Sequence, residues 1–432
     1  MEPSPRPRPP LGRRQALLAL GAELGLAAVG LAALSTCRGG CERGEPGRGR
    51  PGASIPSGPR GSAARGEPAT AVPVAAPKLT PASSSSPFSV LEIGGSHRDI
   101  GLGIGRTFRD SIQALLREQA EFASVVALAG GRLRERVARL EQAARSSYPG
   151  LVEELQGMAE GAGIAFEELF AWNCRSEIDA SSAPCPPGCS TVGWVRDGGL
   201  LLGHNEDGDA AYAHRMFVLR ARPPSGIAFA ALVYPGTLPG NGPGLNARGV
   251  AQATNYIGPC DAAEGVPRYF VGRAVLEAAT LEEAVAIACK DPRAFPWHHN
   301  LGDLGRGVLV SLETWPGRHH RLDVQGLYLH TNHLLHREML DLPEQRAHLD
   351  RSSLPRLRRL ERLFADRPPR SREDLLDALH DRQSTPCKIC RRPGDVVGGI
   401  TVGTALFESP RLEMSLWDGP SCGGPVQVVS PG

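Results

Sequence analysis

The spacing of apolar residues changes at Cys189, and this change limits the folds that are open to the chain. Between residues 88 and 180, apolar side chains recur at helical spacing, which predicts a mainly helical segment. From Thr191 onward, short apolar runs are separated by turn residues, which predicts strands with fewer helices between them. Helices on both sides of a strand-rich centre indicate helical layers packed on antiparallel sheets.

The expected elements follow from this spacing. One long helix is expected from residue 98 to about residue 127. Further helices are expected at residues 131–144, 151–161, 166–172, 268–289, 355–365 and 372–379. Strands are expected at residues 89–93, 191–195, 200–204, 217–221, 228–233, 250–256, 307–312, 327–332, 400–407 and 412–416.

The N-terminal residues 1–40 have the pattern of an export signal. Arg13 and Arg14 follow a basic, Pro-rich start, and the apolar stretch at residues 16–34 is interrupted only by Glu23. The adjacent arginines resemble a twin-arginine signal. We therefore expect export to the periplasm or cell envelope. An uncleaved membrane anchor is the alternative, which Glu23 disfavours.

A lipoprotein-like box ends this signal, and a linker follows it. Leu34-Ser35-Thr36-Cys37 resembles a bacterial lipoprotein box, so Cys37 is a lipidation candidate and a lipid anchor to the membrane is one interpretation. Residues 41–87 are rich in Gly, Pro, Arg, Ala and Ser, and they cannot bury enough apolar surface to offset their ordering entropy. We expect a disordered linker there, followed by residues 88–188 and 189–432 as the two segments of one domain.

Composition excludes some functional classes. The 432 residues carry a formal net charge of +2, with basic and acidic residues mixed along most of the chain. No basic stripe is interleaved with aromatic residues, so a nucleic-acid partner is not expected. The ten cysteines do not settle the redox compartment, and a dense disulfide framework is not expected in a chain of this length.

Cys189 follows Gly188 at the junction between the two segments. A thiol attacks a carbonyl near neutral pH only with a base or with a lowered pKa. A histidine is one candidate base. The α-amine of Cys189 is another, with a pKa near ~8, but it is free only after cleavage of the preceding peptide bond. Gly188 leaves its carbonyl open to the adjacent thiol. A buried structural cysteine is the competing interpretation.

Several short motifs occur in the order found in one enzyme family. They are Tyr148-Pro149 with residues 155–163, Glu167-Glu168-Leu169 with residues 172–178, Gly188-Cys189-Ser190-Thr191, Gly203-His204-Asn205-Glu206-Asp207, and Leu329-His330-Thr331-Asn332-His333. Through them the chain, from about residue 90 to 405, resembles the acyl-CoA:6-aminopenicillanic acid acyltransferase-like group of N-terminal nucleophile hydrolases, peptidase family C45.

This resemblance implies an α+β fold, a four-layer αββα sandwich of antiparallel sheets with a helical N-terminal segment. It also implies autocatalytic cleavage between Gly188 and Cys189. Cys189 would be the nucleophile and its new α-amine the base, while Asp207 would hold that amine. The family's reaction needs no cofactor.

The resemblance assigns roles to three further residues. Asn332 matches the family's oxyanion-hole asparagine, and Arg391, in Ile389-Cys390-Arg391, matches its active-site arginine. Asn255 resembles a second asparagine of related cysteine acylases. Without the resemblance, Asp207 would be a turn residue, Asn332 would cap a turn at a strand end, and Arg391 would be a surface cation.

The histidine motifs indicate no metal site. His330, His333 and His336 are spaced by three, but on a strand this spacing alternates between faces, so structural roles are expected. His298-His299 and His319-His320 are expected in loops or at the surface. Cys387 and Cys390 form a C-x-x-C without a second such pair, so zinc is not expected, whereas a disulfide after export remains open.

The sequence thus predicts an exported, self-processing cysteine hydrolase. Its substrate would be a small-molecule amide, such as an N-acyl amine or N-acyl amino acid, and the intermediate an acyl thioester at Cys189 that water or an amine resolves. The two cleaved segments would stay associated. Two alternatives remain, a strict acyltransferase that uses acyl-CoA and an inactive envelope lipoprotein that keeps the fold as a scaffold.

Overall fold

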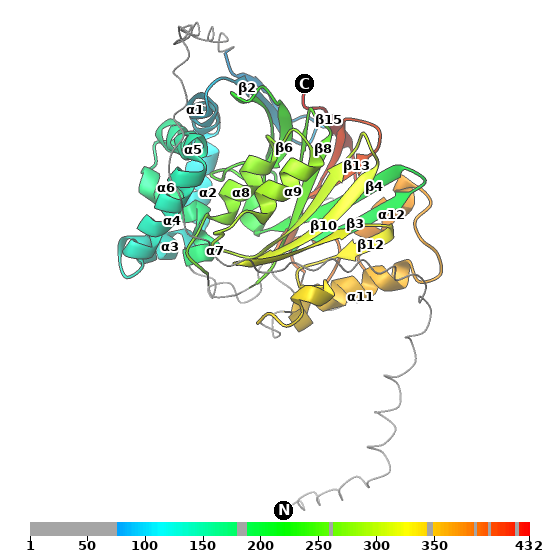
Figure 1. The fold of residues 1–432 in the computed structure, drawn as a ribbon. Coiled ribbons are helices and arrows are strands. Elements are labelled where there is room, and N and C mark those ends of the chain that lie inside the picture. Colours follow the sequence, from blue (N-terminus) through cyan, green and yellow to red (C-terminus); the bar gives the residue numbers. More distant parts are fainter. Residues whose placement is uncertain are drawn as a thin grey trace, which may run out of the picture. The chain divides into compact units, whose positions relative to one another are not determined.

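Two β-sheets lie face to face, and helices cover the outer face of each (Figure 1). The computed structural model describes residues 76–178, 188–258, 262–343, 349–383, 387–395, 399–419 and 423–432, all within one unit at residues 70–432. The predicted export signal with Cys37, and most of the predicted linker, lie outside these ranges. Within them, no helix is both long and apolar enough to cross a membrane.

The larger sheet has nine strands in the order β1-β2-β5-β6-β7-β8-β9-β10-β11. They are β1 (Lys78–Thr80), β2 (Ser89–Gly94), β5 (Phe217–Arg222), β6 (Phe229–Val233), β7 (Gly244–Asn246), β8 (Val250–Tyr256), β9 (Trp297–Asp303), β10 (Val308–Trp315) and β11 (Arg318–Asp323). Strand β1 lies within the predicted linker, so ordered structure begins before Phe88.

One strand pair in this sheet joins the two predicted segments. Strand β2, from the segment before Gly188, pairs in parallel with β5, from the segment after it. The other strand pairs of the described chain are antiparallel. The two segments therefore share one sheet.

The smaller sheet has six strands in the order β12-β3-β4-β13-β14-β15. They are β12 (Gly326–His330), β3 (Ser190–Arg196), β4 (Gly199–Gly208), β13 (Ile400–Glu408), β14 (Met414–Asp418) and β15 (Val426–Val429). Strand β3 begins directly after Cys189 and lies between β12 and β4.

The helices form the two outer layers (Figure 1). Those on the side of the larger sheet are α1 (His97–Thr107), α2 (Arg109–Glu118), α3 (Ala120–Gly130), α4 (Arg134–Ser147), α5 (Pro149–Ala162), α6 (Phe166–Asn173), α7 (Arg175–Ile178), α8 (Arg268–Val275) and α9 (Leu281–Cys289). Helices α11 (Leu354–Leu363) and α12 (Arg372–Leu379) contact the smaller sheet. The predicted α+β class and αββα layering are confirmed.

Two long helices of the prediction are wrong. Residues 98–127 form three helices, because the chain leaves helical geometry at Phe108 and turns extended at Gln119. Residues 268–289 form α8 and α9, and the hydroxyl of Thr280 caps the start of α9. Apolar residues continue at helical spacing through these breaks, so spacing alone does not reveal them.

Glycines allow α1 and α5 to pack backbone against backbone. A Cβ at Gly101 would overlap the carbonyl oxygen of Glu154, and a Cβ at Gly105 would overlap that of Met158. Gly157 and Gly161 on α5 make the matching approaches to α1. No side chain separates the two helices at these contacts, and larger residues there would force them apart.

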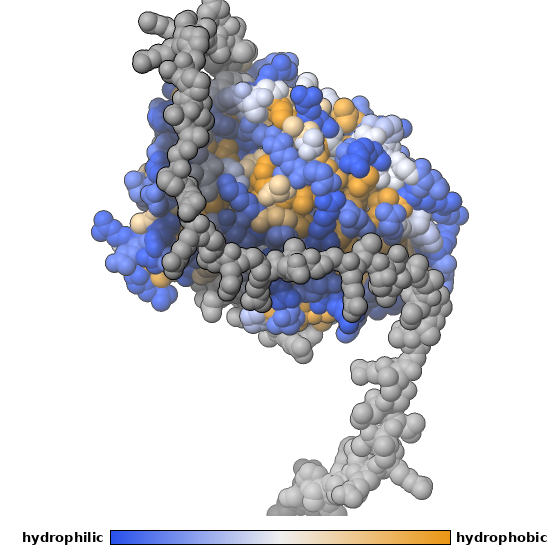
Figure 2. Space-filling view, in the orientation of Figure 1, coloured by the Kyte–Doolittle hydropathy of each residue, from blue (hydrophilic) through white to orange (hydrophobic). Residues whose placement is uncertain are grey.

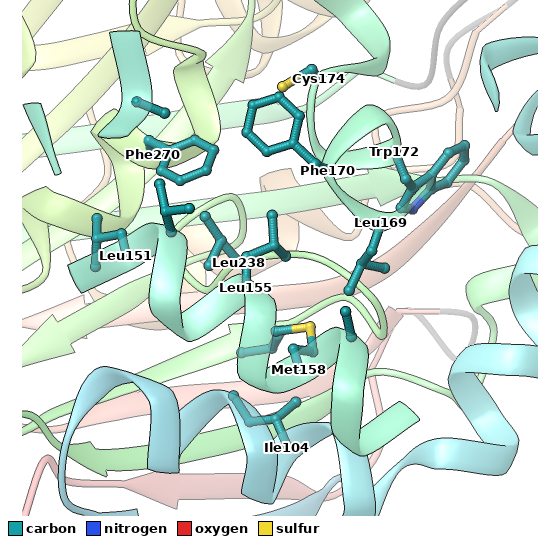
Figure 3. Close-up of a cluster of buried hydrophobic side chains, with 14 of the residues drawn as sticks. Ile104, Leu151, Leu155, Met158, Leu169, Phe170, Trp172, Cys174, Leu238 and Phe270 are labelled. Carbon is teal, nitrogen blue, oxygen red and sulfur yellow. The ribbon is translucent and has the colours of Figure 1, made fainter. Parts of the chain in front are cut away.

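The helical layer packs on the larger sheet through a core of aliphatic and aromatic side chains. Figure 3 shows Leu151, Leu155 and Met158 of α5 beside side chains of α6, α8 and α1. Phe170 of α6 tilts against Phe270 of α8, with ring centroids 5.8 Å apart. This packing holds the segment before Gly188 on the sheet that the later segment completes.

On the face in Figure 2, hydrophobic residues gather toward the middle and hydrophilic residues surround them. Large hydrophobic side chains are exposed on three edge strands, Leu79 on β1, Leu322 on β11, and Val426 and Val428 on β15. An apolar cluster lies between the two sheets, and its fully buried members include Leu202, Val218, Leu232 and Phe407.

Candidate active site around Cys189

Cys189 lies directly before the interior strand β3, and only 5% of the residue is exposed. Ser190 pairs with Asn205 on β4, and Thr191 pairs with His330 on β12. If both pairings are continued by one or two residues to Cys189, Glu206 lies beside it on one side and Asn332 on the other. Strand pairing therefore gathers residues that are far apart in the sequence.

Asp207 borders the thiol through its backbone, and its two carboxylate oxygens have different surroundings. Its backbone N–H donates to the sulfur of Cys189. Thr401 Oγ1 donates to Asp207 Oδ1 at 2.7 Å, and Arg391 Nε lies 3.4 Å from Oδ2. Buried Oδ2 accepts no hydrogen bond within the described chain. Burial raises the pKa of Asp207, although the charges of Arg391 and Arg356 and the Thr401 bond oppose the rise.

Arg391 is an interior residue and not a surface cation, since its exposure is 0%. Its Nη2 donates to Ser352 Oγ at 2.8 Å, and its backbone N–H donates to Thr401 Oγ1 at 2.9 Å. The Thr401 hydroxyl thus accepts from Arg391 and donates to Asp207. The structure thus brings two of the predicted site residues, Arg391 and Asp207, together.

Asn332 lies against Gly188 on the side opposite β4. A Cβ at Gly188 would overlap Asn332 Oδ1, so only glycine fits this approach. Asn332 Nδ2 donates to the carbonyl oxygen of Tyr256 at 3.0 Å, and the backbone N–H of Asn332 donates to Ser353 Oγ at 2.7 Å. An amide nitrogen carries two hydrogens, so Nδ2 can serve a second acceptor.

Arg356 is a site residue that the sequence reasoning missed. Its Nη1 donates to the carbonyl oxygen of Cys189 and, at 2.9 Å, to Ser190 Oγ, and its Nη2 donates to Asn332 Oδ1 at 2.7 Å. The signal was its place on α11, four residues before the buried Leu360 and therefore on the apolar face. A charged residue on that face needs buried partners.

Asn255 lies in a polar cluster between the sheets. Its Oδ1 accepts from Thr191 Oγ1 at 3.0 Å and from Asn300 Nδ2 at 2.9 Å. Its Nδ2 is buried and donates to no described residue. Thr191 is two positions after Cys189 and therefore on the same face of β3. Asn255 thus has an unused donor and contacts Thr191, two positions after Cys189.

His298 and His299 are buried on β9, so their predicted place in a loop or at the surface is wrong. His298 Nδ1 lies 3.1 Å from Asn255 Oδ1, and its Nε2 lies 2.9 Å from Ser311 Oγ. Strand β9 is an interior strand and is covered on both faces, so its polar residues show no alternation between buried and exposed positions.

His204 and Glu206 are two further neighbours of the thiol that the sequence reasoning did not assign. A ring nitrogen of His204, a carboxylate oxygen of Glu206 and the sulfur of Cys189 all lie within 4.8 Å of one another. In the described chain this is the one group of three or more residues with metal-ligand spacing. His204 Nε2 and Glu206 Oε2 already share a hydrogen bond of 3.1 Å.

The environment of Cys189 disfavours its thiolate while the chain is intact. Burial raises the pKa of the Cys189 thiol well above its usual value, and the charges of Glu206 and Asp207 raise it further. The backbone N–H of Asp207 and the charge of Arg356 act in the opposite direction. Nucleophilic attack by this thiol therefore needs a base or an added positive charge close to the sulfur.

The remaining motifs take separate partners. His330 Nε2 lies 3.4 Å from Glu313 Oε1, His333 Nδ1 lies 2.7 Å from Ser353 Oγ, and His336 Nε2 lies 2.8 Å from Ser311 Oγ. Cys390 is disulfide-bonded whereas Cys387 is a thiol, so the two do not pair with each other.

The sequence between β3 and β14 matches one family along more than half of the chain. The model of the acyl-coenzyme A:6-aminopenicillanic acid acyl-transferase family matches residues 194–417. The chain belongs to this family. The predicted family is therefore confirmed, and the match covers β4 with Asp207, β8 with Asn255, and the segments that carry Asn332 and Arg391.

One curated relative is the beta-alanyl-dopamine/carcinine hydrolase of Drosophila melanogaster. It is 28% identical over 229 residues, which are 49% of this chain and 59% of the relative. The chain thus spans less than two thirds of that relative's length.

Solved structures give weaker likenesses. A mutant of the conjugated bile acid hydrolase from Clostridium perfringens has a TM-score of 0.37 at 15% identity, and the match covers 56% of this chain and 92% of that one. The N-acylethanolamine-hydrolyzing acid amidase ortholog of Caenorhabditis elegans scores 0.34 at 15% identity, with coverage of 51% and 92%. Penicillin V acylase from Agrobacterium tumefaciens scores 0.34 at 12% identity, with coverage of 56% and 86%.

Proposed function

We propose that this protein is a self-cleaving cysteine amidohydrolase or acyltransferase that forms an acyl thioester at Cys189. The observation that carries the proposal is the setting of Cys189, a buried thiol directly after Gly188 whose neighbour Asp207 has a buried carboxylate oxygen that accepts no hydrogen bond from a described residue. Membership in an acyl-transferase family and the hydrolase name of the Drosophila relative support acyl transfer from an amide.

The first step converts the intact chain. The thiol of Cys189 attacks the carbonyl carbon of Gly188, the C–N bond between the two residues breaks, and the nitrogen takes a proton to become an α-amine. Water then attacks the resulting thioester, which releases the carboxylate of Gly188 and restores the thiol. Arg356, bonded to the carbonyl oxygen of Cys189 and to Asn332, fixes the backbone around this bond.

The second step uses the new α-amine as the base. It takes the thiol proton, and the thiolate attacks the substrate carbonyl while the amine proton passes to the leaving nitrogen. Asp207 Oδ2 accepts a hydrogen bond from the α-ammonium group and favours its charged form. The unused donor Asn255 Nδ2 and the second hydrogen of Asn332 Nδ2 are suited to a tetrahedral oxyanion.

The two segments stay associated after cleavage in this proposal. Strand β2 is hydrogen-bonded to β5 along six residue pairs. Glu154 of α5 forms a buried ion pair with Arg273 of α8, with Nη2 and Oε2 2.9 Å apart. Both contacts join residues before Gly188 to residues after it, and neither depends on the Gly188–Cys189 bond.

We also propose that the protein is exported to the periplasm or cell envelope, with Cys37 as the lipidation candidate. The basic and apolar pattern of residues 1–40 supports this location. A disulfide at Cys390 supports it too, because disulfides persist mainly outside reducing compartments.

The test of the activity is a hydrolysis screen of the purified protein over acyl-amino acids, penicillins and β-alanyl amines, followed by mass spectrometry of both products. We expect hydrolysis of at least one class and an acyl adduct on Cys189 when the reaction is quenched early. Stronger turnover with an added acceptor amine would favour the acyltransferase. An unreactive Cys189 and no turnover would favour the alternative of an inactive scaffold.

A further inference from the structure

Glu206 places a carboxylate beside the nucleophile, on the face of β4 opposite to Asp207. Residues alternate between faces along a strand, so His204 and Glu206 point to the Cys189 thiol while Asp207 points to Arg391. One carboxylate oxygen of Glu206 lies within 4.8 Å of the sulfur. Glu206 is buried, with 4% of the residue exposed.

Glu206 has no arginine or lysine to balance its charge within the described residues. His204 is its only ion-pair partner there, and Tyr234 Oη donates to its Oε1 at 2.6 Å. The site's two arginines lie on the other side, where both stabilise the charged form of Asp207. A buried carboxylate whose ion-pair partner is a histidine is costly unless that histidine carries a proton or another cation takes its place.

The hydrogen bonds of His204 show where that cation fits. Thr191 Oγ1 donates its one hydrogen to Asn255 Oδ1, so it must accept from His204 Nδ1, 2.9 Å away. His204 Nε2 then faces Glu206 Oε2 at 3.1 Å, and one proton must lie between them. An ammonium group can replace that proton and donate to both atoms at once.

We propose that Glu206, together with His204, binds a primary ammonium group in the acyl part of the substrate, so that the enzyme acts on amides of short α- or β-amino acids. This inference rests on the proposed acyl thioester at Cys189. In a β-aminoacyl group the nitrogen lies about 4 Å from the carbonyl carbon, given ordinary bond lengths. A carboxylate oxygen within 4.8 Å of the sulfur is therefore in reach, and longer chains would overshoot it.

The charge of such a substrate also assists the chemistry. Burial raises the pKa of the Cys189 thiol, and the negative charge of Glu206 is among the causes that raise it further. An ammonium group bound to Glu206 offsets that charge and makes the thiolate easier to form. A neutral acyl group of the same shape gives no such help and leaves the Glu206 carboxylate desolvated.

The experiment compares β-alanyl 4-nitroanilide with butyryl 4-nitroanilide, in which a methyl group replaces the ammonium group. We expect wild-type kcat/KM to favour the β-alanyl substrate on the order of 10²-fold, the value of a lost charged hydrogen bond. Glu206→Gln should reduce this ratio to within a few fold of one, and Glu206→Asp should restore part of it. Self-cleavage, read by intact mass, reports whether each variant has folded.

A matched control and a third substrate separate the outcomes. Glu313→Gln removes another buried carboxylate that faces histidines, and it should leave the ratio unchanged. Equal turnover of both anilides by the wild type, or a ratio that survives Glu206→Gln, would overturn the inference and leave the proposed function standing. The third comparison is between N-butyryl ethylenediamine, which carries an ammonium group on the leaving amine, and N-butyryl propylamine, which carries a methyl group there. If the wild type prefers the first and Glu206→Gln loses this preference, Glu206 binds the amine side, and the acyl-side assignment is overturned. No turnover of any amide, with the chain uncleaved before Cys189, would overturn both proposals.

Discussion

The guanidinium group of Arg356 donates to the amide oxygen of Asn332 at 2.7 Å, and both groups lie against the Cα of Gly188. Arg356 also donates to the carbonyl oxygen of Cys189. The pair therefore holds the backbone on both sides of the proposed cleavage site. It leaves no room for a side chain at residue 188.

Gly188→Ala should slow self-cleavage. The new Cβ would overlap Asn332 Oδ1 and lie 2.6 Å from Arg356 Nη2, so the scissile carbonyl must move. A displacement of this size costs on the order of 10²-fold in rate. The measurement is the loss of full-length chain over time on a denaturing gel. Gly130→Ala is the control, because no atom lies within 4 Å of its Cβ, and wild-type kinetics for Gly188→Ala would refute the packing argument.

Asp207→Asn should lower kcat with little change in KM. In the proposed mechanism Asp207 Oδ2, which accepts no hydrogen bond within the described residues, takes one from the α-ammonium group of Cys189, and an amide in its place would hold that charge poorly. Loss of a positioned acid–base partner costs ~10²-fold or more. Steady-state kinetics of the cleaved enzyme measure both constants. Asp209→Asn, two residues away and exposed, should behave as wild type, and an unchanged kcat for Asp207→Asn would contradict the assignment.

Arg273→Met should destabilise the contact between the two segments. Arg273 and Glu154 are both fully buried and share two hydrogen bonds of 2.9 Å. Removal of one partner leaves a buried charge and costs about 3–5 kcal/mol of unfolding free energy. Denaturant unfolding in a Cys189→Ala background keeps the two segments in one chain. The double variant Glu154→Leu/Arg273→Met should recover most of the loss, and a double variant as unstable as the single one would argue against a charge effect.

His299→Leu should make the fold less sensitive to acid. Burial, with a smaller effect from the charge of Arg293, lowers the pKa of His299 to about 3. The folded state therefore keeps His299 neutral while the unfolded chain gains a proton below about pH 6.5. The contribution of His299 to the unfolding free energy is therefore present above that pH and is lost as the pH falls toward 3. Between pH 7 and pH 5 the loss is about 2 kcal/mol.

The check on His299 is a comparison of unfolding free energies at pH 7 and pH 5. The wild type should lose more stability over this interval than His299→Leu by about the same 2 kcal/mol. His319→Leu is the control, because His319 is exposed on the edge strand β11 and keeps its contact with water in the folded state. Parallel losses in wild type and His299→Leu would contradict a depressed pKa at His299.

The layers of the fold could be predicted because spacing and turn residues reflect which faces are buried. The broken helices could not, since Phe108 and Gln119 interrupt the backbone without disturbing the apolar spacing. Strand β9 was missed for a related reason. Its sequence Trp297-His298-His299-Asn300 is polar, yet it lies in the interior of the larger sheet, where hydrogen bonds to Asn255 and Ser311 replace apolar contacts.

The site residues also fall into those that could be predicted from the sequence and those that could not. Cys189, Asp207, Asn332 and Arg391 lie in short motifs whose order could be recognised. Strand pairing brings the first three together, and an ion pair joins Arg391 to Asp207. Arg356 has no motif, and its role follows from the docking of α11, which local spacing does not specify. Glu206 lay inside a recognised motif, but only the alternation of faces on β4 separates it from Asp207 and turns it toward the thiol.

The central claim is that Cys189 becomes an N-terminal nucleophile by its own reaction, and intact mass with N-terminal sequencing tests it most directly. The purified wild type should yield two polypeptides, the second spanning residues 189–432 and beginning with Cys189, whereas the Cys189→Ala variant should remain one uncut chain. A wild-type chain that stays whole, or a Cys189→Ala variant that is still cut after Gly188, would contradict it.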